Sequence, residues 1–328
     1  MKAFISIIVP SYNNKVNLTR LLRSIKSNLD RCLYLKDLYE VIVVDDGSQE
    51  NLYNLKNLFK FKYIKKKNGG AASARNQGAK YAKGKFLFFL DSDLELTSDF
   101  LSKVLYILKS KKLNVLSFYY NINSINKNLL LASKLKAVLD IYLNHKNQGF
   151  YKDQLIHGQC VIINKNLFER TFGWDESIEK SICEHEEYSK RIIKKSKVYT
   201  NFKIGPFHYY KNYLTTIKEV FERSKIWTLL FYNNKVTKDR RFKFKNIFFR
   251  FFPILSLFAI LIDYKIFLLL ISIFYLYHFK LYGTLLKLKN LKLFCAGILF
   301  YPIIFSVAIT GSISGTLLSI CKNIFDYK

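Results

Sequence analysis

Residues 71–93 read AASARNQGAKYAKGKFLFFLDSD, and this stretch decides the fold. Its first half, Ala71 to Ala82, reads as a helix. Phe86 to Leu90 is a continuous apolar run, which is typical of a strand covered on both faces. Asp91, Ser92 and Asp93 follow that run directly. A helix, a buried strand and an acidic turn in this order indicate part of an α/β sheet.

The segments before this stretch repeat the alternation of strand and helix. Phe4 to Pro10 and Tyr39 to Val44 are runs rich in Ile and Val, and Lys62 to Lys65 reads as a third strand. Val16 to Leu29 and Leu52 to Phe59 read as the helices between them. This alternation predicts an open, mostly parallel sheet that binds its ligand at the carboxyl ends of the strands.

Weaker signals of the same kind follow the acidic turn. We expect helices at Asp99 to Lys109 and Leu129 to Leu143, and strands at Val115 to Tyr120 and Val161 to Asn164. These elements complete a catalytic domain that we place at residues 1–212.

Polar turns follow the first, second and fourth predicted strands. Each turn taken alone is an ordinary loop. Because parallel strands end at one edge of a sheet, the turns are expected to converge there on Lys67 and Arg75. A pocket with carboxylates, flexible backbone and a cation suits a metal-bound nucleotide diphosphate. The segments in question are Pro10–Asn13, Asp45–Ser48, Lys67–Gly70, Ala74–Gly78 and Asp91–Asp93.

Asp91 and Asp93 are the candidate metal ligands of this pocket. A sugar nucleotide loses a diphosphate that bears several negative charges, and a divalent cation held by carboxylates can neutralise that leaving group. Both Mn²⁺ and Mg²⁺ accept carboxylate and phosphate ligands, so the sequence leaves the choice open.

Four motifs, taken in order, resemble glycosyltransferase family 2. They are IIVPSYN at 7–13, VVDDGS at 43–48, the stretch at 71–93, and GWDE at 173–176. The resemblance covers about the first 210 residues. It implies the GT-A fold, a nucleotide-sugar donor and inversion at the anomeric carbon.

The resemblance also implies roles for residues on the donor side. Tyr12 would stack near the base, Asp46 would bond the base, and Arg75 would support the nucleotide. Asp91 would contact the ribose or the metal, and Asp93 would ligate the metal. We assign to the donor side, in addition, Pro10, Lys67 and Ser92.

The catalytic base is expected at the start of a later helix. The family carries an acidic pair there, and its second carboxylate is commonly the base. The matching residues are Glu184, His185 and Glu186, with His185 in the place of that second carboxylate. His185 is our candidate base, because a neutral imidazole accepts a proton near neutral pH; Glu184 or Glu186 is the alternative.

Three further residues complete the expected site. Trp174 and Asp175 would shape the acceptor side, since an aromatic face packs on sugar C–H groups. His208 resembles the late histidine of the family that can complete the metal site. The Gln-x-x-Arg-Trp motif of processive members is missing near Trp227, which favours transfer of a single sugar.

The last quarter of the chain predicts a membrane region. We expect connecting helices at the membrane surface over residues 213–250, whose Arg240, Arg241 and Lys243 would face lipid headgroups. Residues 251–322 form the hydrophobic region, with a helical hairpin over about 251–279 and a spanning helix over about 293–320.

The hairpin is expected to turn at Asp263 to Lys265, which would be costly in mid-bilayer. Basic residues flank it on both sides, so the positive-inside rule places the catalytic domain at the cytoplasmic face of the inner membrane. Gly311 and Gly315 have the spacing that lets helices approach closely, which also allows two copies of the chain to associate.

The composition sets limits on other functions. A formal net charge of +29 attracts anionic lipids and phosphorylated substrates. No nucleic-acid-binding motif accompanies this charge, so we exclude nucleic acid as a partner. The five cysteines lack close pairing, which favours a reducing compartment.

The sequence thus predicts a metal-dependent glycosyltransferase of cell-envelope polysaccharide synthesis, with a nucleotide-diphosphate sugar as donor and a lipid-linked or glycan acceptor. Two alternatives remain. One is a membrane scaffold with a degenerate transferase domain. The other is an aspartate-dependent phosphotransferase, although such enzymes carry the Asp-x-Asp motif after their first strand.

Overall fold

The computed structural model describes residues 3–121, 123–127, 130–144, 149–178, 183–236 and 248–325. Its contacts divide the chain into two compact units. The sheet unit comprises Met1–Lys127 and Lys146–Tyr209, and the helical unit comprises Asn128–His145 and Tyr210–Lys328. Each unit buries its own set of apolar side chains.

Eight strands of the described residues form one mixed sheet in the order β3-β2-β1-β4-β8-β6-β9-β7. Parallel pairing joins β1 to β2 and β4, β2 to β3, and β6 to β9, whereas β8 pairs antiparallel with β4 and β6, as β7 does with β9. The predicted α/β sheet is confirmed. Its strands are β1 (Ile5–Ser11), β2 (Tyr39–Asp45), β3 (Lys62–Lys65), β4 (Phe86–Leu90), β6 (Val115–Phe118), β7 (Phe150–Asp153), β8 (Cys160–Asn164) and β9 (Val198–Asn201).

Helices cover this sheet because their apolar residues recur every three or four positions. Helix α1 (Lys15–Arg31) buries Leu18, Leu21, Leu22, Ile25 and Leu29. The remaining elements of the unit are α2 (Gly70–Tyr81), β5 (Leu94–Glu95), α3 (Phe100–Lys111), α4 (Ser124–Lys127), α6 (Lys165–Arg170), α7 (Glu184–Ile192) and β10 (Phe207–His208). The helix expected at Leu52 to Phe59 is only a 3₁₀ turn, Tyr53–Asn57.

The helical unit contains α5 (Leu131–Asn144), α8 (Tyr213–Tyr232), α10 (Phe252–Ala259), α11 (Tyr264–Tyr277), α12 (Phe279–Lys287) and α13 (Leu291–Phe325). The sequence places the segment of α5 in the catalytic domain, but its contacts assign it to this unit. The Tyr301 hydroxyl of α13 donates to the Leu135 carbonyl of α5 at 3.3 Å. This helix thus groups with residues beyond the expected boundary at residue 212, because it packs on α12 and α13.

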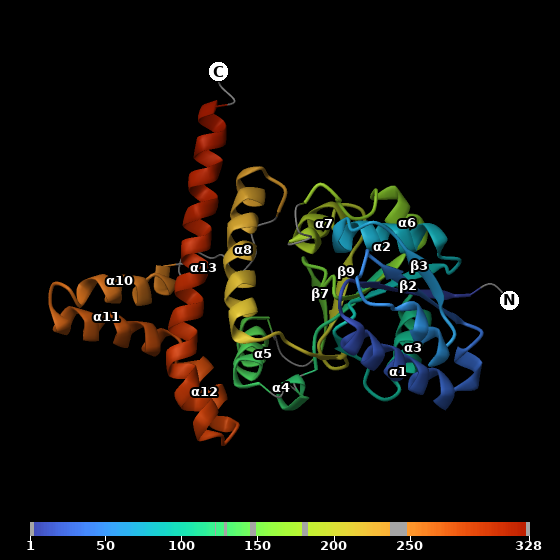
Figure 1. Cartoon of the computed structure of the whole chain (residues 1–328), viewed down its shortest axis with the longest axis horizontal. Helices are drawn as coiled ribbons and strands as arrows, with labels where there is room; N and C mark the ends of the chain where they lie inside the picture. Colours follow the sequence, from blue (N-terminus) through green and yellow to red (C-terminus); the bar gives the residue numbers. More distant parts are fainter. Residues whose placement is uncertain are drawn as a thin grey trace. The chain divides into compact units, whose positions relative to one another are not determined.

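Gly311 and Gly315 let α13 lie close to α8, and Figure 1 shows the two helices side by side. A Cβ atom on Gly311 would lie 2.4 Å from the Phe221 carbonyl oxygen, and one on Gly315 would lie 2.5 Å from that of Lys225. The glycine spacing thus serves a contact within the chain.

Helices α10 and α11 form the predicted hairpin (Figure 1). The turn is at Asp263, whose carboxylate accepts a hydrogen bond from Lys265 N at 2.7 Å. Among the described residues, one helix, Leu291–Cys321, is long and apolar enough to cross a membrane, and the bent pair α11 and α12 would make a second if it counts as one span. Arg240, Arg241 and Lys243, expected at the headgroups, lie outside the described residues.

Candidate active site

The carboxyl ends of β1, β2 and β4 meet at one edge of the sheet. Asn14 Nδ2 donates to Ser92 Oγ at 2.9 Å, and Asn13 N donates to Ser48 Oγ at 3.0 Å, so these bonds join the loops after the three strands. Asn13 has a φ of 45°, in the left-handed region that Asn tolerates better than most residues. The Tyr12 side chain beside it is 50% exposed.

Asp46 is buried and organises the loop before α2. Its Oδ1 accepts hydrogen bonds from Lys66 Nζ at 2.7 Å and Gly69 N at 3.0 Å, and its Oδ2 accepts one from Gly70 N at 2.8 Å. The first N–H groups of a helix lack partners within the helix, so this carboxylate satisfies the start of α2. A contact between Asp46 and a base would have to add to these bonds or replace one of them.

Two other residues that we assigned to the donor side lie in different surroundings. Pro10 is buried inside β1, where it pairs with Val44, so it shapes the strand and does not line an open pocket. Lys67 is exposed, and its carbonyl accepts a hydrogen bond from Lys66 Nζ at 2.7 Å. Of the two, only the Lys67 side chain reaches the surface.

Arg75 connects the acidic turn after β4 to the start of α7. Its Nη2 donates to Asp91 Oδ1 at 2.7 Å, and its Nη1 donates to Glu184 Oε1 at 2.8 Å. The guanidinium carbon lies 5.0 Å from the ring centroid of Trp174, and the side chain is 3% exposed. One buried cation therefore holds two carboxylates that are 93 positions apart in the sequence, since 184 − 91 = 93.

The electrostatics of this cluster follow from its burial. Burial lowers the pKa of Arg75, but Asp91 and Glu184 outweigh it and hold that pKa above its ordinary value. Burial raises the pKa of Asp91; Arg75 opposes this shift and Asp93 adds to it. The charge of Asp93 thus makes ionisation of Asp91 more costly. A cation bound beside the two carboxylates would reduce this cost.

Asp93 and His208 are brought together by the short antiparallel pair β5 and β10, in which His208 lies opposite Leu94. Asp93 Oδ2 lies 3.4 Å from His208 Nε2, and the imidazole stacks on Tyr120 at 4.3 Å between ring centroids. The described residues contain no group of three or more His, Cys, Asp or Glu that could hold a metal.

Of the three expected metal ligands, Asp93 and His208 face each other, whereas Asp91 Oδ1 is paired with Arg75. Asp93 and His208 still fit a cation that takes its other ligands from phosphate and water, which is how Mg²⁺ is usually bound.

The three candidate bases open α7, which follows Cys183 at a φ of 68°. Glu184 Oε1 forms an ion pair with Arg75. His185 Nε2 lies 3.0 Å from Glu186 Oε2, and both side chains are buried. A Cβ on Gly158 would lie 2.8 Å from the Cβ of His185, so a glycine at 158 leaves the space that this histidine needs.

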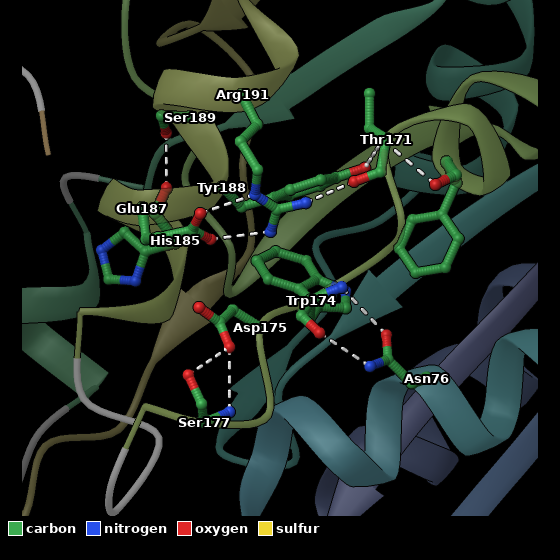
Figure 2. Close-up of polar contacts among 11 residues, drawn as sticks. Asn76, Thr171, Trp174, Asp175, Ser177, His185, Glu187, Tyr188, Ser189 and Arg191 are labelled. Atoms are coloured by element: carbon green, nitrogen blue, oxygen red, sulfur yellow. Dashed lines mark hydrogen bonds and ion pairs between the residues drawn. The ribbon is translucent and has the colours of Figure 1, made fainter. Parts of the chain in front are cut away.

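Trp174 is 1% exposed, and its ring packs 4.8 Å from Tyr188 and 5.5 Å from Phe89 between centroids. A ring enclosed in the core has no face to offer a sugar, so the expected stacking role of Trp174 does not fit the structure. Its place is fixed by Asn76, whose Nδ2 donates to the Trp174 carbonyl and whose Oδ1 accepts from the Trp174 amide (Figure 2). Asp175 forms a turn in which it accepts hydrogen bonds from the Ser177 amide and hydroxyl.

Some residues that hold the site were not singled out in the sequence. Arg191 forms a bidentate pair with Glu187 at 2.6 and 2.7 Å and also donates to the Thr171 carbonyl (Figure 2). The spacing of Glu187 and Arg191, four positions apart on a helix, is a signal that could have found this pair. Asn76 lies inside the Ala74–Gly78 segment without a role of its own, and nothing in the sequence marks Gly158, since both act through contacts with distant segments.

Comparison with known proteins identifies the family of this chain. The profile described as glycosyl transferase family 2 matches residues 6–172, about half of the chain. The poly(ribitol-phosphate) β-N-acetylglucosaminyltransferase TarP of Staphylococcus aureus strain N315 is 39% identical over 95 residues, which cover 27% of this chain and 28% of that protein. The minor teichoic acid biosynthesis protein GgaA of Bacillus subtilis strain 168 is 28% identical over 220 residues, which cover 63% of this chain and 47% of that protein. The chain thus matches less than half the length of each relative.

The mannosyltransferase PcManGT of Pyrobaculum calidifontis, solved in complex with GDP-Man and Mn²⁺, resembles the structure with a TM-score of 0.57. The match covers 96% of this chain and 88% of that chain. Because the sequences are only 14% identical, it shows a similar fold and nothing more. With the strand order, the converging polar turns and the family profile in agreement, the protein is a member of glycosyl transferase family 2 with a GT-A-like fold.

Proposed function

We propose that this protein transfers a single sugar, with inversion, from a nucleotide-diphosphate sugar to a lipid-linked or glycan acceptor at the cytoplasmic face of a membrane. The observation that carries this proposal is the Arg75 bridge between Asp91 and Glu184. It joins the edge where a donor would lie to the helix that carries the candidate base.

The donor would occupy the edge formed by the loops after β1, β2 and β4. Tyr12 offers a half-exposed ring for the base, and Lys67 and Arg75 supply positive charge. Ser92 is fixed by Asn14, which holds the acidic turn against the loop that carries Tyr12. The departing diphosphate gains negative charge as the glycosidic bond breaks, so preorganised cations at this edge stabilise the transition state.

Asp93 and His208 would hold a divalent cation, Mn²⁺ or Mg²⁺, against the diphosphate. When bound, such a cation neutralises the leaving group. Asp91 would accept the hydrogen bond from Arg75 and so position the guanidinium beside the cation.

His185 would take the proton from the acceptor hydroxyl as that oxygen attacks the anomeric carbon. The 3.0 Å approach of Nε2 to Glu186 Oε2 would leave Nδ1 as the ring nitrogen that takes the proton. Glu184 fits this role less well, because its Oε1 already accepts a hydrogen bond from Arg75. Asp175, at the turn beside α2, would contribute to the acceptor side through its carboxylate and not through the neighbouring indole.

The helical unit would attach the protein to the membrane. Its hairpin exposes a run of large apolar side chains around the turn, and α13 is long and apolar enough to span a bilayer. Because α8 lies along α13 and carries Lys218, Glu219 and Glu222, we place the main lipid contact on the hairpin and on the side of α13 away from α8.

A donor screen tests the proposal. The purified full chain is incubated with UDP-, GDP- and dTDP-sugars in Mn²⁺ or Mg²⁺, and release of the nucleoside diphosphate is measured with and without a membrane extract as acceptor source. We expect release with one nucleotide class, and faster release with the extract. No release with any donor in either condition contradicts the proposal.

A further inference from the structure

A cavity of about 780 Å³ lies along α1 in the sheet unit. Its walls are one side of α1 and the end of β5 with the residues that follow it. The charged residues of the lining are Lys15, Arg20, Arg23 and Glu95, and hydroxyl and amide side chains lie between them. None of Tyr12, Asp46, Asp91 or Asp93 lines it. Its size is within the range of ligand sites, and it is distinct from the proposed donor site.

The polar wall arises from the helical period of α1. Leu18, Leu22 and Ile25 face the core, so the residues between them point away from it. Lys15, Thr19 and Arg23 follow one another at intervals of four residues, which places them in one row along the helix. This row runs along the cavity for more than two helical turns.

The positive charges of this wall are not balanced within the described residues. Lys15, Arg20 and Arg23 take part in none of the ion pairs found there, whereas Lys26 on the same helix pairs with Asp30. Arg20 is held in place by its stacking on Tyr209, 3.6 Å from the ring centroid, and by Asn17.

The one carboxylate of the lining is already compensated. Glu95 Oε1 pairs with Lys127 at 3.1 Å, and Glu95 Oε2 accepts a hydrogen bond from the Tyr209 hydroxyl. Glu50 contacts the start of the helix only through the Lys15 amide, at 3.2 Å. The cavity therefore presents excess positive charge to whatever enters it.

The cavity begins next to the proposed site of transfer. Asn14, directly before Lys15, donates to Ser92 of the acidic turn, and Glu95 follows Asp93 by two positions. A chain whose end reaches Asp93 can thus continue along α1.

We propose that this cavity binds phosphate groups of the acceptor, so that the acceptor is a polymer of phosphate diesters and not a neutral glycan. This inference rests on the proposed function and names its acceptor class. Phosphate oxygens accept charge-assisted hydrogen bonds from guanidinium and ammonium groups, and a row of such groups matches the repeated charge of a polyol phosphate.

Equilibrium binding of a fluorescent ribitol-phosphate oligomer to the full chain, without donor, tests the proposal. The polyol phosphate in the name of the relative TarP supplies this probe. The test variant is Lys15→Gln/Arg23→Gln. Lys26→Gln is the matched control, since it removes a charge from the same helix outside the cavity.

We expect the double variant to bind the oligomer roughly tenfold more weakly, because it loses two charge-assisted contacts that are partly exposed. The control should stay within about twofold of the wild type, and a neutral oligosaccharide should not compete. Donor hydrolysis in the double variant should be unchanged, so the two proposals can fail separately.

Equal binding by the wild type and the double variant overturns the inference, as does no binding by the wild type. A parallel measurement uses vesicles of phosphatidylglycerol and phosphatidylcholine in equal parts. If the double variant loses vesicle binding but keeps oligomer binding, the cavity serves lipid headgroups and the inference is wrong.

Discussion

The sheet unit and the helical unit distribute charge and apolar surface in opposite ways. The sheet unit buries Asp46, Arg75 and Glu184 in its interior, each with a partner of opposite charge. The helical unit instead exposes apolar residues in sequence, such as Leu261 at 83% and Ile262 at 81%. Buried charge suits a unit that performs polar chemistry, and an exposed apolar run suits one that contacts lipid.

The largest effect is expected from removing the buried cation of the sheet unit. Arg75→Gln leaves Asp91 and Glu184 without their common partner, and breaking a buried pair costs about 3–5 kcal/mol of unfolding free energy. Denaturant unfolding of the full chain, followed by tryptophan fluorescence, measures this loss. Lys26→Gln breaks an exposed pair and should cost less than about 1 kcal/mol. Similar costs for the two variants would contradict the contrast between buried and exposed charge.

The next effect concerns catalysis at the start of α7. His185→Ala should lower kcat by about 100-fold or more at saturating donor while donor binding is preserved, because general-base catalysis is worth about 10²–10⁴-fold. Glu186→Gln should give a smaller loss, since we propose that this side chain contacts the imidazole without taking the proton. If His185→Ala is nearly normal and Glu184→Gln or Glu186→Gln is inactive, the role of base belongs to that carboxylate.

A smaller effect is expected where two helices of the helical unit meet. Gly311→Ala forces a Cβ against the Phe221 carbonyl, and overpacking of this kind costs about 1–3 kcal/mol. Gly283→Ala is the control, because a Cβ there meets no atom within 4 Å and helical alanine is favoured over glycine by about 0.5–1 kcal/mol. The thermal unfolding temperature in detergent should therefore fall for Gly311→Ala and rise for Gly283→Ala. A shift of both temperatures in the same direction would contradict the close contact of Gly311 with α8.

The smallest effect on stability is expected at the hairpin. Leu261→Asn should change the unfolding free energy by less than about 0.5 kcal/mol, because the side chain is already exposed. Co-sedimentation with vesicles should nevertheless decrease several-fold. Phe172→Asn in the sheet unit is the control, since Phe172 is 90% exposed yet should not contribute to vesicle binding. Equal decreases for both variants would show that exposed apolar side chains of the two units contribute equally to vesicle binding.

Short apolar runs made most of the sheet predictable. β3 and β4 begin and end at the predicted residues, and for β4 the reason is that its apolar run lies between the Gly84–Lys85 bend and Asp91. The polar turns at their ends also follow from the topology. Local patterns could not reveal that α5 belongs to the helical unit, since an amphipathic helix does not specify its partner.

The site could be predicted only in part, because local patterns do not specify which distant segments come together. Asp93 and His208 were grouped through a family resemblance, and the structure brings them together by pairing β5 with β10. Trp174 looked suited to a sugar because aromatic rings serve both cores and binding sites, and its burial depends on Phe89 and Tyr188 from other segments. The cavity along α1 needs β5 as a second wall, which no local pattern in α1 indicates.

We propose that the acidic turn after β4 helps to hold the divalent cation that assists sugar transfer. The most direct measurement compares the wild type with Asp93→Ala, using the donor that the screen identifies, in the presence of Mn²⁺ or Mg²⁺. Circular dichroism checks that both proteins are folded. We expect steady release of nucleoside diphosphate by the wild type and release at background level by the variant, because the variant lacks a carboxylate that we propose as a metal ligand. Near-normal turnover by the folded variant would contradict it.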